Sequence, residues 1–333
     1  MKKVSILTPC YNGALFIHRL LDSILVQTYP NIEMFVINDG STDNSEEIVK
    51  SYIPKFKDRG INLKCVNQPN QGQAAAINNG LKLISGDYLI WPDSDDFFAS
   101  KESIAKMAAV LNEKPDFSVV RTFANLLDEN TLKKVGEHGG KKYSKNKRTD
   151  LFEDCLFTTN DFWYGAGDYM IRLDVFKQTY TDMNIFVPSK YGGQNWQLML
   201  PVLYKQKCFT IEEFLYNILV RKQSHSRGLF RSLKDVIKKN EEYEKTILVT
   251  LKRINMPTDD YENYKTNVYI KYLLNRIDIL LLFGYKNDAR KIFLKLKNEY
   301  KSVPFKDQVL RIRIKMLPFV NEAKKVISGF MKK

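Results

Sequence analysis

The amino-acid sequence predicts an α/β protein, built on a mainly parallel sheet with helices on both faces and followed by a helical C-terminal region. Two observations support this fold class. In roughly the first hundred residues, short apolar runs alternate with helical patterns, which is typical of a parallel sheet. From about residue 229 onward, the pattern is helical and rich in charge. We therefore expect two domains, residues 1–228 and residues 229–333.

The expected elements follow one another in strand–helix order. The predicted strands are 4–8, 32–37, 63–67 and 88–91, and the helices between them are 14–27, 45–56 and 74–84. In the first of these helices, apolar residues recur at spacings of three and four, so that one face can cover the sheet. These residues are Ile17, Leu20, Leu21, Ile24 and Leu25. The stretch 136–148, rich in Gly and Lys, is expected to be an exposed loop, or else a flap over a site.

Composition narrows the class of protein. Of the 333 residues, 44% are apolar, which is enough for a sizeable core. No stretch reaches the roughly twenty uninterrupted apolar residues of a membrane-spanning helix, and the apolar run after Met1-Lys2-Lys3 is too short for an export signal. The four cysteines lie far apart without a C-x-x-C pair. We therefore expect free thiols in a reducing, cytoplasmic compartment rather than disulfides or a zinc site.

The net charge of +14 implies an anionic partner, which by charge alone is a nucleic acid, an anionic membrane or a phosphorylated substrate. In the last segment, 301–333, nine Lys or Arg stand against Asp307 and Glu322 among apolar residues. Such a segment is suited to an anionic membrane surface, which predicts peripheral attachment to the inner face of the cell membrane. The alternative is a solvated helix packed on the protein, and Pro318 interrupts any single helix here.

The most informative segment is the end of the fourth predicted strand, where Asp93, Asp95 and Asp96 place three carboxylates within four residues. This density is unfavourable unless a cation is present. Oxygen ligands of this kind suit Mg²⁺ or Mn²⁺ shared with a substrate diphosphate. The alternative is an ordinary polar turn that caps the helix beginning near Ser100. The D-x-D pattern alone does not decide between the two.

Two other strand ends carry polar residues, and ligands bind at the carboxyl ends of parallel strands. Asp39 follows the second strand in an Asp-Gly turn, where its carboxylate can accept hydrogen bonds from a base or a ribose. Asp43, further on, is expected to cap the next helix. Tyr11 follows the first strand, where its ring either stacks on a nucleobase or packs within the turn.

Taken in order, these segments resemble the family 2 glycosyltransferases of the GT-A fold. The resemblance covers residues 1 to about 100, and its motifs follow in family order and spacing. The matching segments are 4–12, 23–30, 36–43, 70–80 and 86–96. The resemblance implies that Pro9, Tyr11 and Asp39 hold the nucleoside of a nucleotide-diphosphate sugar. It also implies that Asp93 reaches the ribose or the metal, and that Asp95 ligates the metal on the donor diphosphate.

The same resemblance implies a reaction. An acceptor hydroxyl, on a saccharide or on a lipid-linked carrier, would attack the anomeric carbon with inversion. Mn²⁺ or Mg²⁺ would stabilise the charge that develops on the departing nucleoside diphosphate. The family resemblance further suggests a bacterial type of enzyme that builds surface polysaccharides at the cytoplasmic face of the membrane.

The sequence departs from the family where a general base is expected. Relatives often have Glu-Asp at the start of a later helix, where this chain has Gln194 and Asn195. Neither amide can take a proton at neutral pH. We expect these two residues to orient the acceptor, and another carboxylate, Asp168 or Asp161, to act as the base. The alternative for Asp168 is a loop residue bonded to its own backbone.

Three further features remain. Ile77 stands where many relatives carry Arg, so a donor contact is either missing or supplied elsewhere. The segment 221–227 resembles the Ser-rich segment after the last strand of relatives, and is interpreted either as a lid on the donor diphosphate or as a solvated connector. His18 and His138 lack companion ligands, so we assign them no role.

Other classes of function fit less well. A nucleic-acid-binding protein does not explain clustered acids at strand ends, which would repel phosphate without a cation. A degenerate relative that binds a nucleotide sugar or a membrane without catalysis is motivated by Gln194 and Asn195. A nucleotidyltransferase would share the metal and the sheet, but the sequence has no Gly-rich phosphate loop with a paired Lys near the first strand.

Overall fold

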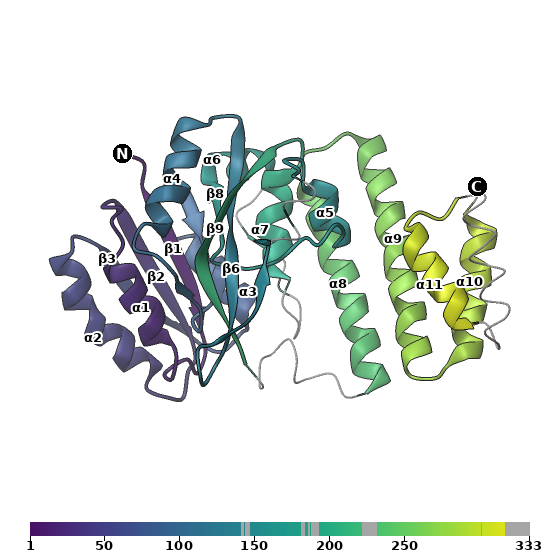
Figure 1. Cartoon of the computed structure of the whole chain (residues 1–333), viewed down its shortest axis with the longest axis horizontal. Coiled ribbons are helices and arrows are strands. Elements are labelled where there is room, and N and C mark those ends of the chain that lie inside the picture. Colours follow the sequence, from purple (N-terminus) through teal and green to yellow (C-terminus); the bar gives the residue numbers. More distant parts are fainter. Residues whose placement is uncertain are drawn as a thin grey trace. The chain divides into compact units, whose positions relative to one another are not determined.

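The computed structural model describes residues 1–140, 143, 147–180, 184–185, 187, 193–221, 232–300 and 302–316 (Figure 1). The chain divides into two compact units, each with its own internal packing. The first comprises Met1–Lys222 with Lys252–Asn255, and the second comprises Gln223–Leu251 with Met256–Lys333. The sheet belongs to the first unit, and the described residues of the second form helices.

Nine strands in the described part of the chain form one sheet in the order β3-β2-β1-β4-β8-β6-β9-β5, with β7 paired to β6. Their bounds are β1 Val4–Cys10, β2 Ile32–Asp39, β3 Asn62–Gln68, β4 Tyr88–Ile90, β5 Phe97–Phe98, β6 Phe117–Asp128, β7 Lys134–His138, β8 Tyr169–Arg172 and β9 Lys207–Val220. β3, β2, β1 and β4 are parallel, as the strand–helix alternation predicts. β8 runs antiparallel to β4 and β6 and joins this half to the parallel pair β6 and β9. The sheet is therefore mixed, and its parallel half carries the expected ligand-binding edge.

Helices of the first unit flank this sheet (Figure 1). Within the described residues they are α1 Ile17–Leu25, α2 Ser45–Asp58, α3 Gln73–Leu81, α4 Ser103–Glu113, α5 Phe152–Phe157, α6 Leu173–Thr179 and α7 Gln194–Leu203. The predicted apolar face of α1 is buried in the main core, although Leu25 is only partly covered. Asp43 accepts the N–H of Ser45 at the start of α2, as expected, and also the N–H of Ala14 ahead of α1.

One predicted loop is in part a strand. β7 pairs antiparallel with the second half of β6, where His138 lies opposite Ala124. Its residues are mostly exposed and polar, so they lack the apolar alternation by which strands are recognised. The strand forms because β6 extends beyond its pairing with β8, and the free backbone groups of this edge find partners in β7.

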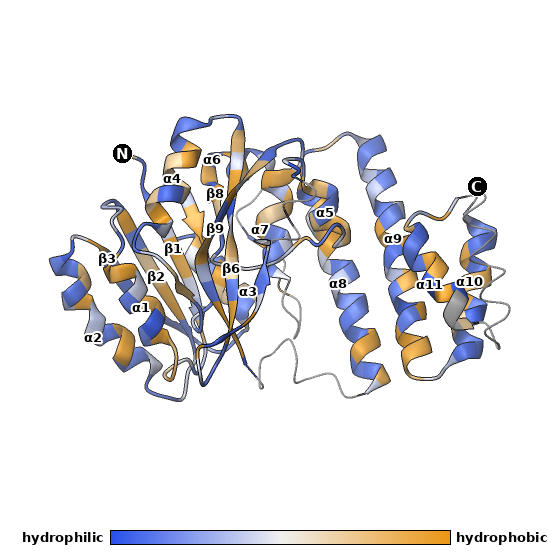
Figure 2. Cartoon of the chain, viewed as in Figure 1, coloured by the Kyte–Doolittle hydropathy of each residue, from blue (hydrophilic) through white to orange (hydrophobic). Residues whose placement is uncertain are grey.

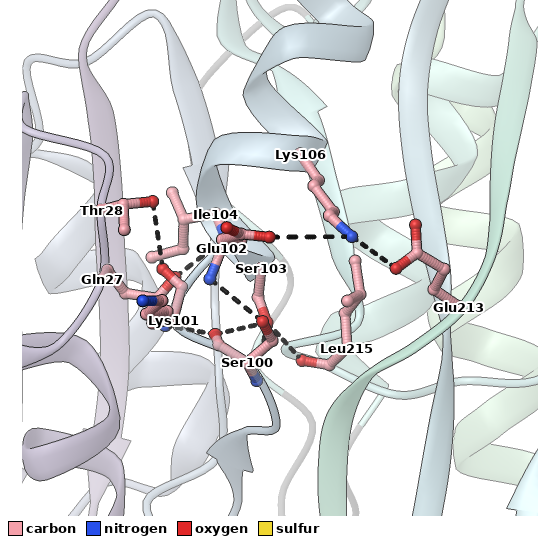
Figure 3. A network of polar contacts seen from close by, with 10 residues as sticks. All are labelled: Gln27, Thr28, Ser100, Lys101, Glu102, Ser103, Ile104, Lys106, Glu213 and Leu215. Atoms are coloured by element: carbon pink, nitrogen blue, oxygen red, sulfur yellow. Dashed lines mark hydrogen bonds and ion pairs between the residues drawn. The ribbon is translucent and has the colours of Figure 1, made fainter.

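The side chain of Gln27 fastens the segment that leads into α4 (Figure 3). Its amide donates to the carbonyl of Ser100 at 2.8 Å, and its carbonyl oxygen accepts the N–H of Ile104 at 3.0 Å. The Ser103 hydroxyl donates to the carbonyl of Leu215 in β9 at 2.8 Å. Since these contacts satisfy the start of α4, the carboxylates that precede it are not needed as its caps, and the alternative interpretation of Asp93, Asp95 and Asp96 loses its support.

The described part of the second unit contains α8 Leu233–Arg253 up to Leu251, together with α9 Thr258–Leu282, α10 Lys286–Glu299 and α11 Lys306–Met316. Apolar side chains of α9, α10 and α11 form one core, and their apolar and polar residues are interleaved along each helix (Figure 2). Val309 and Ile312 of α11 are buried in this core. The first part of the predicted basic tail therefore packs on its own unit, while 317–333 lie outside the described residues. No described helix is both long and apolar enough to cross a bilayer.

Candidate active site

The parallel strands bring three predicted segments to one edge of the sheet. β1 and β2 are paired in register, with Cys10 opposite Asn38, so Tyr11, directly after β1, and Asp39, the last residue of β2, lie at adjacent strand ends. β4 pairs with the other side of β1, and the chain leaves it toward the acid segment, which we define as Asp93–Asp96. The residues predicted to bind the nucleoside and those predicted to bind the metal thus lie at one edge of the sheet.

Two carboxylates of the acid segment have raised pKa values. Asp93 is half-buried and accepts a hydrogen bond from Gln73 at the start of α3, at 2.6 Å. Burial, and next the charge of Asp95, raise the pKa of Asp93 to about 7. Asp96 is buried and accepts the N–H of Leu219 at 2.9 Å, and burial raises its pKa well above the usual range. Carboxylates held this close together favour a bound positive charge.

Asp95 has a cationic partner in this structure. The Nη1 atom of Arg221 lies 2.9 Å from Oδ2 of Asp95, and its Nε lies 3.9 Å from a carboxylate oxygen of Glu129. The guanidinium also lies over the ring of Phe16, 4.3 Å from its centroid. Arg221 is the first residue of the predicted lid, and the remainder, 222–227, lies outside the described residues. A side chain of this chain therefore holds the position where a cation is expected.

The residues predicted to bind the nucleoside differ in how exposed their side chains are. Pro9 is buried within β1, whereas the side chain of Tyr11 is exposed. Asp39 is almost fully buried, and both of its oxygens accept hydrogen bonds. The donors are the amide of Gln68 at 2.6 Å and the backbone N–H groups of Gln71 and Gly72 at 2.9 and 2.8 Å. Asp39 thus also fixes the turn that leads directly into α3.

A second cluster surrounds Asp168. This side chain is fully buried at the start of β8, and neither carboxylate oxygen has a hydrogen-bond partner among the described residues. Nδ1 of His138 is 3.7 Å from its Oδ2. Burial raises the pKa of Asp168, and His138 and Arg121 offset part of that increase. A Cβ on Gly165 would overlap the carboxyl group, so the glycine permits the close packing that buries it.

Tyr216 of β9 connects this cluster electrostatically with the acid segment. Burial raises the pKa of Tyr216, and the carboxylates of the acid segment and of Asp168 raise it further. Its buried hydroxyl has no hydrogen-bond partner among the described residues. A Cβ on Gly167 would overlap the Tyr216 ring, so the loop before β8 lies directly on it. Asp168 therefore belongs to the same electrostatic environment as the candidate metal ligands.

Gln194 and Asn195 serve in part to fasten α7. Oδ1 of Asn195 accepts the indole N–H of Trp91 at 2.8 Å, directly ahead of the acid segment. Gln194 is buried, and its side-chain oxygen accepts the N–H of Gly193. The other candidate base, Asp161, is exposed in a turn. The sequence assigned no role to His138, and it gave no sign that this residue lies beside Asp168, since the pairing of β6 with β7 brings the two together.

A mixed α/β sheet with these carboxylates at its parallel edge, together with a helical C-terminal unit, defines a protein of the GT-A glycosyltransferase class. The family described as glycosyl transferase family 2 matches residues 5–179. The match covers more than half of the chain, and the chain belongs to this family.

Relatives and solved structures agree with this assignment. Glycosyltransferase GlyA of Streptococcus pneumoniae is 29% identical over 231 residues, which cover 68% of this chain and 32% of GlyA. An uncharacterized glycosyltransferase of Haemophilus influenzae is 39% identical over 140 residues, which cover 40% of this chain and 53% of that protein. The chain thus matches between a third and about half of the length of these relatives.

Two solved structures share the fold. TarS residues 1–349 of S. aureus, in complex with UDP-GlcNAc, has a TM-score of 0.62 at 18% identity, over 90% of this chain and 91% of that one. The mannosyltransferase PcManGT of Pyrobaculum calidifontis, in complex with GDP-Man and Mn²⁺, has a TM-score of 0.53 at 13% identity, over 95% and 85% of the two chains. At these identities the likeness is one of fold.

Proposed function

We propose that this chain transfers a sugar, with inversion at the anomeric carbon, from a nucleoside-diphosphate sugar to an acceptor hydroxyl. The observation that carries the proposal is the acid segment at the rim. Its carboxylates do not cap α4, and the pKa values of Asp93 and Asp96 are raised. Fold relatives that hold UDP-GlcNAc, or GDP-Man with Mn²⁺, support a nucleotide sugar as the donor.

The carboxylates of the acid segment fit a divalent cation that is also bound by the phosphates of the sugar donor. Within the described residues, no group of three or more His, Cys, Asp or Glu is placed to hold a metal by itself. Asp93 and Asp95 supply two carboxylates, and Mg²⁺ or Mn²⁺ in such sites commonly takes its other ligands from substrate phosphates and water. When bound, the cation would stabilise negative charge on the departing nucleoside diphosphate.

The chain's own residues then have separate tasks. Tyr11 and Pro9 face the nucleoside. Asp39 accepts a hydrogen bond from the base or the ribose of the nucleoside while it holds the turn before α3. Arg221 leaves Asp95 and pairs with the donor diphosphate, since a guanidinium binds phosphate as well as it binds carboxylate. Gln194 and Asn195 keep α7 at the acceptor side, and the acceptor proton passes to the buried cluster that contains Asp168.

A second candidate is a degenerate relative that binds a nucleotide sugar without transferring it. The observation that favours it is the pair of amides at Gln194 and Asn195, where relatives often carry carboxylates. The two candidates agree on donor binding and differ on turnover.

The experiment combines binding with turnover. Melting of the full chain is followed with a panel of UDP-, GDP-, TDP- and CMP-sugars, each with and without Mn²⁺ or Mg²⁺, because a ligand of the folded state raises the melting temperature. Release of the nucleotide from the binding donor is then measured. Asp95→Ala is expected to abolish cation-dependent stabilisation, whereas Asp116→Ala, in an exposed turn before β6, is not.

The outcomes separate the candidates. A cation-dependent shift with nucleotide release supports the transferase. A shift without release supports the degenerate relative. If no nucleotide sugar shifts the melting temperature, both are refuted. Turnover that persists in excess chelator would refute the metal assignment alone.

The role in surface-polysaccharide synthesis, with a saccharide or lipid-linked acceptor at the inner face of the membrane, is also a proposal. It is supported by the excess of positive charge and by the basic residues of 317–333.

A further inference from the structure

The base assigned to the Asp168 cluster cannot be the Asp168 carboxylate acting directly on the acceptor. The side chain has no exposed surface, and both oxygens are closed off from solvent. The loop residue Gly165 packs so closely on the carboxyl group that a methyl group would not fit between them. A general base must come within hydrogen-bond reach of the hydroxyl whose proton it takes. Another group must therefore connect Asp168 with the acceptor.

His138 is placed to make that connection. Its Nδ1 is buried and lies 3.7 Å from Oδ2 of Asp168, and neither atom has a hydrogen-bond partner among the described residues. Yet 27% of the His138 side chain is exposed. Because Nδ1 is buried, this exposure comes from the rest of the side chain, and we infer that it includes the opposite edge of the ring, which carries Nε2. The gap is longer than a hydrogen bond, as is common in catalytic pairs before the substrate binds.

The sheet register explains why these residues meet. His138 and Tyr216 lie opposite Ala124, on either side of β6. The N–H of Thr122, two residues earlier in the same strand, donates to the carbonyl of Asp168. Alternate residues of a strand point to the same face, and so do their cross-strand neighbours. His138, Asp168 and Tyr216 therefore share one face, and Tyr216 in turn senses the charges of the acid segment.

We propose that His138 is the general base of the transfer reaction and that Asp168 is the positioning residue that orients it. This proposal rests on the proposed function. Nε2 accepts the proton of the acceptor hydroxyl while the acceptor oxygen forms a bond to the anomeric carbon. The bond from that carbon to the donor phosphate oxygen breaks, and its electron pair leaves with the nucleoside diphosphate. The Asp168 carboxylate stabilises the imidazolium through Nδ1–H, as in other Asp–His pairs. Solvent water takes the proton from Nε2 after the products leave.

The pair replaces what the sequence lacks at Gln194 and Asn195. The charged groups around it are Arg121 of β6, which shares the environment of Asp168, and Asp96 of the acid segment. Arg121 balances the buried carboxylate when His138 is neutral. An imidazole that carries its proton on Nδ1 has a free lone pair on Nε2, and this lone pair can accept the proton of the acceptor hydroxyl.

The test measures donor binding and turnover separately in the full chain with Mn²⁺. The probes are UDP-GlcNAc, GDP-mannose and the other nucleotide sugars, with water and glycerol as acceptors, and the readout is release of the nucleotide. His138→Gln is expected to lose about 100-fold or more in turnover, the size of a general-base contribution. Its donor affinity, from thermal shift, should remain within twofold. Glu137→Gln, its neighbour in β7, is the matched control and should keep full turnover.

Chemical rescue adds a readout that a structural role would not move. Imidazole in the buffer should restore part of the turnover of His138→Gly and none of that of Asp95→Ala. Asp168→Asn should lower turnover while leaving donor affinity unchanged. If wild type binds and releases nucleotide but His138→Gln stays within threefold of it, the pair is refuted and the transferase stands. If wild type releases nucleotide from no donor, the proposed function itself fails, and the pair fails with it.

A measurement on the wild type removes dependence on the folding of variants. Diethyl pyrocarbonate acylates accessible imidazole nitrogens, and the chain has only His18, His138 and His225 to distinguish by mass spectrometry. Loss of turnover should follow acylation of His138 and reverse with hydroxylamine. A His138 that does not react, or full turnover with His138 fully acylated, would overturn the proposal.

Discussion

Replacing Asp93 by Asn should stabilise the cation-free protein at alkaline pH. Burial and Asp95 raise the pKa of Asp93 from 3.8 to about 7. The folded state therefore binds a proton more tightly than the unfolded state, so its stability falls as the pH rises from about 4 to 7 and stays low above 7. The amide introduced by this substitution would carry no charge, and it keeps an oxygen that accepts the bond from Gln73.

The magnitude follows from the shift. Three pKa units correspond to about 4 kcal/mol at most, and partial exposure of Asp93 reduces this to about 2 kcal/mol. For a chain of 333 residues, about 2 kcal/mol raises the melting temperature by roughly 2–4 °C. The difference between Asp93→Asn and wild type should therefore be near zero at pH 4 and reach this range at pH 8.

The assay is thermal melting of both proteins from pH 4 to 8, in chelator and then in Mn²⁺. Mn²⁺ with the donor should remove the advantage of Asp93→Asn, since only wild type gains the ligand. Asp43→Asn is the control of opposite sign. Burial raises the pKa of Asp43, but hydrogen bonds from Ser45 and Ala14 outweigh burial and lower it, so this variant should be less stable than wild type at pH 8. An Asp93→Asn protein that melts below wild type at pH 8 in chelator would refute the reasoning.

Three further changes have defined outcomes. Arg221→Gln should tighten Mn²⁺ binding in the absence of the sugar donor and weaken binding of the donor. It should alter the free energy of unfolding by less than about 1 kcal/mol, because the ion pair with Asp95 is partly exposed. Mn²⁺ titrations followed by thermal melting would check these outcomes. Gly167→Ala should cost about 1–3 kcal/mol in urea unfolding, since its Cβ overlaps the Tyr216 ring, and an unchanged midpoint would contradict the packing. Deleting 317–333 should reduce sedimentation with anionic liposomes more than donor binding, and equal sedimentation would argue against membrane attachment.

The sequence predicted the parallel half of the sheet because each of its strands is an apolar run with its own local signal. It also predicted the acid segment, since its residues are consecutive. His138 could not be found in this way. Its strand β7 is polar, and its partner Asp168 comes from a different segment that meets it only through β6. Nor did the sequence indicate that Arg221 lies on Asp95, because that contact spans 126 residues.

The interpretation of Gln194 and Asn195 illustrates a different limit. Their amide chemistry excluded a base, and this followed from the residue types alone. What the amides do instead depends on tertiary neighbours. Asn195 accepts from Trp91, and no pattern in either segment predicts that pair.

The turn held by Asp39 also constrains how this site can be redesigned. Asp39 binds the N–H of Gly72, and the next residue, Gln73, binds Asp93. Two consecutive residues, Gly72 and Gln73, thus connect the proposed nucleoside contact, Asp39, with the proposed metal ligand, Asp93. A substitution that retunes Asp39 toward another nucleobase would release this turn and shift Asp93 with it. Nucleotide preference in this chain is therefore better engineered around Tyr11, whose ring is exposed.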